Sequence, residues 1–236
     1  MTFSPSTRVV VLGGTSGIGL AVASAAADAG AQVVIGSRSQ RSVERALAEL
    51  PATVTGRPAD VTDPGSVAAF FAATGAFDHL VYTAGDALAR GPVTAYDPDA
   101  AAAFFDVRLF RALDAVRLAL PTLAPAGSIT LTSGAAAFHG GAGRLLGSTV
   151  SGAVITAARS LAVELAPIRV NAVAPGPVRT PLWAGAPDAL FDQLAAGTLL
   201  GRVAEPMDVA RAYLALMQQD YVTGTVAVVD GGSVLA

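Results

Sequence analysis

Residues 8–19 read RVVVLGGTSGIG, an uninterrupted aliphatic run followed at once by a glycine-rich turn. The aliphatic run predicts a buried strand over residues 8–12, and the pattern from Gly17 to about Ala29 predicts a helix. Glycine lets the backbone turn tightly between them and approach a bound pyrophosphate, while the N-terminus of the helix offers free N–H groups to the phosphates. The order strand, glycine turn, helix therefore predicts dinucleotide binding at the start of the chain.

The same alternation of apolar runs and helical stretches continues to the end of the chain. We expect further strands at 32–35, 53–57, 78–82, 128–132, 169–173 and 225–229. We expect further helices at 39–50, after Asp63-Pro64, and at 98–120, 145–165 and 206–218. Strands that are apolar throughout and alternate with helices indicate a parallel sheet covered on both faces. The chain is therefore expected to form one doubly wound α/β domain over residues 1–236, with 174–201 as its one long irregular stretch.

The composition excludes several kinds of chemistry. Among the 236 residues are fifteen arginines, no lysine, no cysteine and two histidines, His79 and His139. A Schiff-base lysine, a thiol nucleophile, a disulfide or a cysteine-ligated zinc is therefore impossible. No aspartate stands at metal-ligand spacing from a histidine, so we expect no metal site. His79 follows Asp78 on an expected strand and is interpreted as a buried, hydrogen-bonded residue.

Charge and hydropathy limit the expected partners. The formal net charge is −3 and the arginines are scattered, so no basic stripe for nucleic acid is present. No run of about 18 uninterrupted apolar residues occurs, and the first residues lack the apolar segment of a signal peptide. We expect a soluble, cytoplasmic protein whose partner is a small-molecule substrate or ligand, without nucleic acid or membrane.

Several motifs in the same order resemble the short-chain dehydrogenase/reductase (SDR) family over nearly the whole chain. Gly13, Gly17 and Gly19 match its glycine motif, and Thr83-Ala84-Gly85 matches its Asn-Ala-Gly motif with the asparagine replaced. Asn171-Ala172-Val173-Ala174-Pro175-Gly176 and the tail from Arg202 to Gly232 match two further patterns. The resemblance implies a single-domain Rossmann fold with a seven-stranded parallel sheet in the order 3-2-1-4-5-6-7. It also implies a homo-oligomer, a dimer or tetramer, formed through the helices at 98–120 and 145–165. The long irregular stretch at the end of a strand, with Leu182, Trp183 and Phe191, separately predicts a substrate lid at about residues 181–200.

The resemblance and the glycine turn together predict the cofactor contacts. The expected contacts are Gly13, Thr15, Ser16, Gly17, Ile18, Gly19, Ser37, Arg38, Asp60, Val61, Thr83, Ala84, Gly85, Pro175, Gly176, Val178 and Thr180. At the end of the second strand, NAD-specific relatives place a carboxylate that binds the ribose 2′-OH and repels a 2′-phosphate. Here that position is Ser37, followed by Arg38 with Arg41 nearby. A hydroxyl beside a guanidinium suits a phosphate, so NADP(H) is favoured over NAD(H).

The catalytic residues of the resembled family are mostly replaced. Its serine position falls on Gly134, or on Ser133 with a shift of one residue, and its asparagine position falls on Arg108. Its tyrosine and lysine positions fall on Gly147 and Ser151. Because the chain contains no lysine, no shift of the alignment restores that residue. The chain therefore resembles an atypical member that lacks the Tyr-x-x-x-Lys pair.

Other groups could act at the catalytic end. Arg108 could stand where the ammonium group normally stands and bind a ribose or an anionic substrate, although it is no acid near neutral pH. His139, six residues after Ser133, has a side chain suited to general acid catalysis, and Tyr96 is a further candidate donor. A loop residue without a catalytic role is the competing interpretation for His139 and Tyr96. The candidate catalytic residues are thus Ser133, Arg108 and His139.

Three functions remain open on the sequence. The first is an NADP(H)-dependent oxidoreductase that reduces a carbonyl or imine without the usual acid–base pair. The second is a catalytically silent protein that keeps the dinucleotide as a structural or sensed ligand. The third is an isomerase or cyclase that uses the same scaffold without net redox change.

Overall fold

The computed structural model describes residues 3–85 and 88–236. Its central element is one sheet of seven parallel strands in the order β3-β2-β1-β4-β5-β6-β7, which confirms the expected order. The strands are β1 (Arg8–Leu12), β2 (Gln32–Ser37), β3 (Val54–Pro58), β4 (Phe77–Tyr82), β5 (Leu123–Thr132), β6 (Arg169–Pro175) and β7 (Val226–Val229). The expected strands are all present, and their ends differ from the expectation by a few residues.

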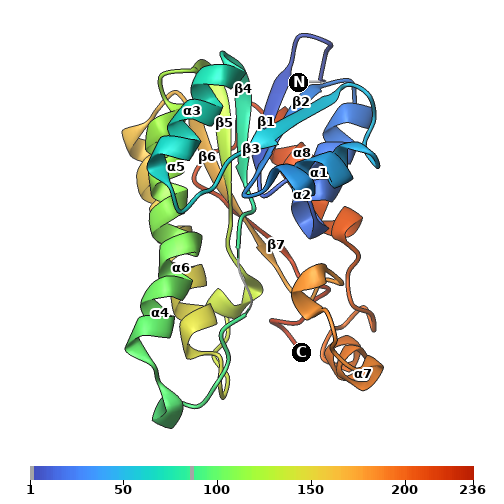
Figure 1. The fold of residues 1–236 in the computed structure, drawn as a ribbon. Helices are drawn as coiled ribbons and strands as arrows, with labels where there is room; N and C mark the ends of the chain where they lie inside the picture. The colour runs from blue at the N-terminus through green and yellow to red at the C-terminus, as the bar shows by residue number, and fades with distance from the viewer. Residues whose placement is uncertain (1–2, 86–87) are drawn as a thin grey trace.

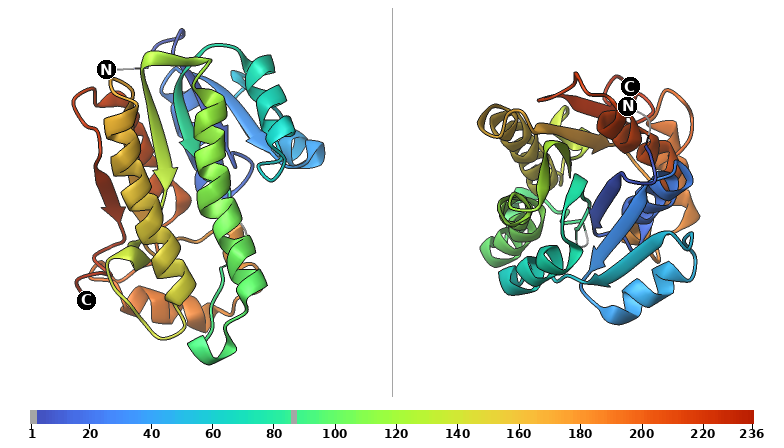
Figure 2. Two further views of the ribbon diagram at one scale, coloured as in Figure 1. Left: turned by 90° about the vertical axis from the view of Figure 1, so that its left-hand side faces the viewer. Right: turned by 90° about the horizontal axis from the view of Figure 1, so that it is seen from above.

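Helices cover both faces of this sheet, as Figures 1 and 2 show. One face carries α1 (Gly17–Asp28), α2 (Gln40–Leu47) and α8 (Pro206–Gln218). The other carries α3 (Pro64–Thr74), α4 (Pro98–Phe105), α5 (Arg111–Ala119) and α6 (Leu145–Glu164). A further helix, α7 (Asp188–Ala196), lies beyond the carboxyl ends of the strands, and short 3₁₀ turns occupy Val93–Ala95, Ala135–Ala137 and Pro181–Trp183.

The aliphatic run of β1 explains why the sheet is buried on both sides. Its side chains alternate between the two faces, as in any strand. Val9 and Val11 pack in the cluster that contains α1 and α8, whereas Val10 and Leu12 pack in the cluster that contains α3, α5 and α6. All four side chains are fully buried. A strand with apolar neighbours on both faces has no position for a polar residue, so the run is continuous rather than alternating.

Helix α3 begins at the polar residue that the sequence indicates. The Asp63 side chain accepts a hydrogen bond from the Gly65 N–H at 2.9 Å, and Pro64 occupies the first helical position. Proline is tolerated there because the backbone N–H that it lacks would have no hydrogen-bond partner within the helix. Just after α1, Gly30 adopts a φ of +99°, the left-handed conformation typical of a glycine that ends a helix.

The structure corrects two expectations. The helix expected over residues 98–120 is divided by a π-helical turn at Asp106–Phe110. In this turn the Tyr82 hydroxyl donates a hydrogen bond to the Val107 carbonyl at 2.6 Å. A side chain that binds a backbone carbonyl competes with the helical N–H for that acceptor, and such competition accompanies irregular helical turns. The segment 174–201, expected to be irregular, contains helix α7.

Helix α6 is the one described helix that is long and apolar enough to cross a membrane by length and composition alone. Its buried residues recur every three or four positions, for example Val150, Val154 and Ala158, and they pack on the sheet. Such a stripe is typical of a helix that covers a sheet. The apolar composition of α6 is therefore accounted for by its place in the fold.

His79 on β4 is buried and hydrogen-bonded, as the sequence indicates. Its Nδ1 lies 2.8 Å from the Ser128 hydroxyl of β5, and its ring packs against Phe3 with 5.8 Å between ring centroids. Burial lowers the pKa of His79 to about 4, and Arg169 adds to this effect while Asp78 opposes it. The imidazole is therefore neutral in the folded protein at neutral pH.

We predict that His79 makes the fold sensitive to mild acid. Below pH 6.5 the unfolded chain takes up a proton that the folded protein refuses until about pH 4, so stability falls across this window as the pH decreases. The effect on the free energy of unfolding is about 3 kcal/mol. Urea unfolding at pH 7, 5.5 and 4.5 should show a smaller decrease for His79→Gln than for the wild type. Equal decreases in both proteins would contradict this account.

Candidate active site

One cavity of about 690 Å³ lies at the carboxyl ends of the central strands. Parallel strands bring these ends to one edge of the sheet, where ligands of such folds bind. Every residue expected to contact the cofactor lines this cavity. Arg108, Ser133, His139, Gly147 and Ser151 line it as well. The structure therefore brings both sets of sequence-predicted residues together.

The glycine turn lines the cavity and packs closely against its neighbours. Gly13 has a φ of +90°, and a Cβ there would lie 2.6 Å from the Ala84 nitrogen. A Cβ on Gly19 would overlap the Gly13 carbonyl oxygen, and Gly17 has a φ of +51°. The N-cap of α1, Ser16, makes no side-chain capping bond, so the first N–H groups of α1 are not capped by it. These features fit the diphosphate of a dinucleotide, which such N–H groups bind.

The end of β2 carries the features expected around a ribose. Thr15 donates a hydrogen bond to the Ser37 hydroxyl at 2.9 Å, which fixes Ser37 beside the glycine turn. Arg38 lines the cavity next to it, but Arg41 does not. Instead Arg45 of α2 lines the cavity together with Ser42. Ser42 and Arg45 are three residues apart, which places them on one face of a helix. This spacing is the sequence signal that could have indicated Arg45 as a further residue of the site.

Asp60 follows β3 at the same end of the cavity. Its Oδ1 accepts two hydrogen bonds from Thr62, one from the backbone N–H at 3.0 Å and one from the hydroxyl at 2.7 Å. Partial burial acts to raise the pKa of Asp60, but these bonds and the charge of Arg38 outweigh it and hold the pKa below its usual value. Asp60 is thus a fixed carboxylate that can accept a hydrogen bond from a ligand. Over the described residues, no group of three potential ligands is placed to hold a metal ion.

The two serines near the end of β5 have different roles. The Ser133 hydroxyl donates to the Ser151 carbonyl of α6 at 2.8 Å, so its proton is engaged in holding β5 against α6. A Cβ on Gly134 would lie 2.9 Å from the Ser151 hydroxyl oxygen. The Ser151 hydroxyl therefore lies directly beside the place where the side chain of a larger residue at position 134 would begin. A Cβ on Gly147 would meet nothing within 4 Å.

Arg108 projects from the π-helical turn into the cavity wall. Its guanidinium stacks over the Phe104 ring, with 4.5 Å from Cζ to the ring centroid. The group also packs against Gly85, where a Cβ would overlap Nη1. Glycine at position 85 thus makes room for this arginine beside the Thr83-Ala84-Gly85 segment. Single π-helical turns occur frequently at functional sites.

His139 is paired with an arginine that the sequence did not indicate. The Arg144 Nη1 lies 3.1 Å from His139 Nε2, and both residues line the cavity. Arginine only donates hydrogen bonds, so Nε2 accepts and the proton of the neutral imidazole is on Nδ1. In this arrangement His139 is a hydrogen-bond donor through Nδ1.

None of the four tyrosines, all of them within the described chain, lines the cavity. Tyr82 and Tyr213 are buried packing residues, and burial raises the pKa of Tyr213, whose hydroxyl lies 2.6 Å from that of Thr132. Tyr221 is 96% exposed. Tyr96, a candidate donor in the sequence, lies instead in a separate apolar groove beside α4 and α6.

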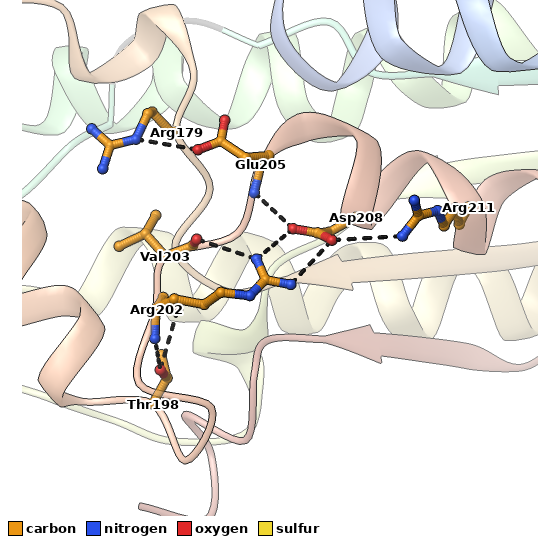
Figure 3. Close-up of polar contacts among 7 residues, drawn as sticks. All are labelled: Arg179, Thr198, Arg202, Val203, Glu205, Asp208 and Arg211. Carbon is orange, nitrogen blue, oxygen red and sulfur yellow. Dashed lines mark hydrogen bonds and ion pairs between the residues drawn. The ribbon is translucent and has the colours of Figure 1, made fainter.

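The segment between Arg179 and Val203, here called the insert, follows β6 and lines part of the cavity. Its base is closed by backbone hydrogen bonds from Arg179 to Ala204 at 2.8 Å and from Ala204 to Pro177 at 3.0 Å. Figure 3 shows the polar contacts beside this base, in which Arg202 binds both oxygens of Asp208 at 2.6 and 3.1 Å. The Glu205 N–H donates to the same carboxylate at 2.9 Å. The bonds from Arg202 and Glu205 lower the pKa of Asp208 to about 2.

Comparisons with known proteins agree with this geometry. A family model described as enoyl-(acyl carrier protein) reductase matches residues 13–234. The short-chain dehydrogenase/reductase ucsE of Acremonium sp. is 38% identical over 97% of this chain and 95% of its own. A small-chain dehydrogenase solved in complex with NADPH is 34% identical, with a TM-score of 0.82, over 98% of this chain and 99% of its own. The MalC reductase/Diels-Alderase from Malbranchea aurantiaca is 29% identical, with a TM-score of 0.89, over 98% of this chain and 97% of its own.

We predict that Asp208 keeps the insert closed at its base. Asp208→Asn removes the charge that binds Arg202, so chymotrypsin should cut within residues 182–200 about threefold to tenfold faster. Arg211→Gln is the matched control, because Arg211 lies 3.8 Å from Asp208 and its side chain is mostly exposed. Timed digestion followed by mass spectrometry measures both rates. Equal rates in the two variants would show that the Arg202–Asp208 contact does not hold the insert.

Proposed function

The chain belongs to the short-chain dehydrogenase/reductase family, and from this premise we propose that it is an NADP(H)-dependent oxidoreductase that reduces a carbonyl or imine without a tyrosine–lysine pair. The carrying observation is one cavity that the glycine turn, Asp60, Arg108 and Ser151 all line. A nucleotide bound along the turn therefore extends toward a site where a small molecule can lie. When bound, the nicotinamide supplies the reducing equivalent.

The preference for NADP(H) rests on charge at the end of β2. Ser37 carries no charge that would repel a phosphate, and Arg38 and Arg45 line the cavity on the same side. Guanidinium groups match phosphate geometry, because each offers several N–H donors in one plane. Asp60 lies beyond them, where the negative charge is fixed by Thr62 and Arg38.

We predict that Arg38 discriminates between the two nucleotides. In Arg38→Ser the dissociation constant for NADPH should rise about tenfold to a hundredfold, since a charged hydrogen bond is lost, while that for NADH should change little. Isothermal titration calorimetry measures both constants. Arg41→Ser is the matched control and should leave them unchanged, because Arg41 does not line the cavity. An equal loss of affinity for both nucleotides would refute the assignment to the 2′-phosphate.

The chemistry that we propose for this chain is polarisation of the substrate without a side-chain acid. The Ser151 hydroxyl is next to the missing side chain of Gly134 and can donate to the substrate oxygen or nitrogen. The Arg108 guanidinium can stabilise the negative charge that develops there. Ser133 supports Ser151 by binding its carbonyl. Water then supplies the proton, and the loss of general acid catalysis slows the reaction by about 10²–10⁴-fold without abolishing it.

We predict that Ser151 and Arg108 act on the chemical step. Ser151→Ala and Arg108→Met should each lower kcat for NADPH oxidation with a panel of ketones, aldehydes and imines by about tenfold or more. The dissociation constant for NADPH should stay within about twofold, since neither residue is placed at the phosphates. Ser160→Ala, on the exposed side of the same helix, is the control. Unchanged kcat in either variant would remove that residue from the mechanism.

A second candidate function is ring formation or isomerisation without redox change. Its support is the likeness to a protein described as a reductase/Diels-Alderase, together with an apolar wall of Leu182, Trp183 and Leu194 at the substrate end. A cavity of this kind can orient an apolar substrate without an acid or a base. Conversion of a substrate without consumption of NADPH would favour this function over reduction. A nucleotide that binds without any turnover would favour the silent or sensing protein.

We also propose that the chain forms a homo-oligomer. An apolar groove runs over α4 and α6 and is lined by Val93, Tyr96, Pro98, Ala101, Ala102, Phe105, Phe110, Leu145, Leu146 and Thr149. Val93, Tyr96 and Phe110 are more than half exposed. A contiguous apolar surface of this kind is typical of a protein–protein contact. A second copy of the chain is the expected partner, because the helices expected to form the family's dimer and tetramer contacts supply this groove.

A further inference from the structure

The substrate end of the cavity is rich in positive charge. Three arginines line it, namely Arg90, Arg108 and Arg144. Among the described lining residues there is one carboxylate, that of Asp60, and it lies at the cofactor end. Positive charge in a cavity raises the local concentration of anions, and among the described residues neither Arg90 nor Arg144 has a carboxylate within ion-pair distance.

Arg90 and Arg144 lie on two loops that are joined through the backbone. The Gly91 N–H donates to the Gly143 carbonyl at 3.1 Å, so the two arginines flank one point of contact. Neither guanidinium lies within 4 Å of a carboxylate elsewhere in residues 3–85 and 88–236. The Arg144 stem folds back over Gly141, where a Cβ would lie 3.0 Å from Cδ. Glycine at position 141 thus allows Arg144 to reach His139.

His139 helps to orient Arg144. Its Nε2 accepts a hydrogen bond from Arg144 Nη1 at 3.1 Å, and both residues line the cavity. The contact between them is neutral on the histidine side when the imidazole is uncharged, so it leaves the charge of Arg144 available to an anion. Arg144 is therefore held at the cavity surface without a carboxylate partner among the described residues.

The same end of the cavity also has apolar lining. Trp183 lines it, and Arg90 stacks on the indole with 5.0 Å from Cζ to the ring centroid. Phe191 packs against Trp183 with 6.3 Å between ring centroids and supports it from within the insert. A ligand with an apolar body against Trp183 and an anionic group toward Arg144 would match both the apolar and the charged lining of this end.

We propose that the substrate carries a carboxylate, held by Arg144, which His139 orients, with Arg90 adding positive charge beside Trp183. The proposal deepens the proposed function, because it names the substrate class of the same cavity. It rests on the proposed function in one respect, that the bound ligand is a substrate. Binding of a carboxylate itself requires no turnover.

The test compares benzoate with benzamide, two planar probes of nearly equal size that differ in charge. Trp183 is the only tryptophan, so its fluorescence reports binding to the NADP⁺-loaded protein without any reaction. Benzoate should bind about tenfold or more tightly than benzamide, as expected for a charge-assisted contact. In Arg144→Gln the two dissociation constants should agree within about twofold, with benzamide unchanged. Arg159→Gln, an exposed arginine of α6 outside the cavity, should keep the preference.

Salt provides a measurement that does not depend on a variant. Raising NaCl from 0.05 to 1 M should weaken benzoate binding and leave benzamide binding nearly constant, because salt screens only the charged contact (Debye length about 3 Å at 1 M). Equal affinities in the wild type, no binding of benzoate, or a preference that survives Arg144→Gln would overturn the proposal. If benzoate is preferred but no carbonyl compound or imine consumes NADPH, the proposed function fails and the carboxylate site stands. If NADPH is consumed but the probes bind equally, the carboxylate site fails alone.

Discussion

The burial of both faces of the central sheet is the constraint on which the rest of the structure depends. Strands such as β1 must be apolar at every position, because α1 and α8 cover one face while α3, α5 and α6 cover the other. The side chains that can meet a ligand then lie at the edge where the strands end. The glycine turn, Asp60, Ser151 and Arg108 all lie at that edge and line one cavity. Function is thus confined to the loops and helix ends that follow the strands.

The two ends of the cavity differ in how far they follow the family. The cofactor end keeps a tight glycine turn and an uncapped helix N-terminus that fit a diphosphate. The substrate end contains neither a tyrosine nor a lysine; instead, serine, histidine and arginine side chains line it. We propose that hydrogen bonding and positive charge act on a substrate there, through Ser151 of α6 and Arg108 of the π-helical turn.

Much of the fold and of the cofactor end could be predicted from the sequence, because both depend on local patterns. Continuous apolar runs indicate buried parallel strands, and the Asp63-Pro64 and Gly30 signals act within one helical turn. The π-helical turn could not be predicted in this way, since it accompanies a hydrogen bond from Tyr82, a residue distant in the sequence. The pairing of Arg144 with His139 was missed for a related reason: it depends on how a glycine-containing loop folds back. The proximity of the Ser151 hydroxyl to Gly134, on which the proposed role of Ser151 rests, depends on how α6 packs against the end of β5 and could not be predicted from a local pattern.

The central claim is that reduction proceeds in this cavity without a tyrosine–lysine pair. It is tested most directly by following the label from NADPH deuterated at C4 of the nicotinamide into product. The wild-type protein, incubated with the labelled nucleotide and a panel of carbonyl compounds and imines, should yield an alcohol or amine carrying one deuterium on the former carbonyl or imine carbon, detected by mass spectrometry. Tight binding of NADPH with no deuterium in any product, even after long incubation at high protein concentration, would contradict the account.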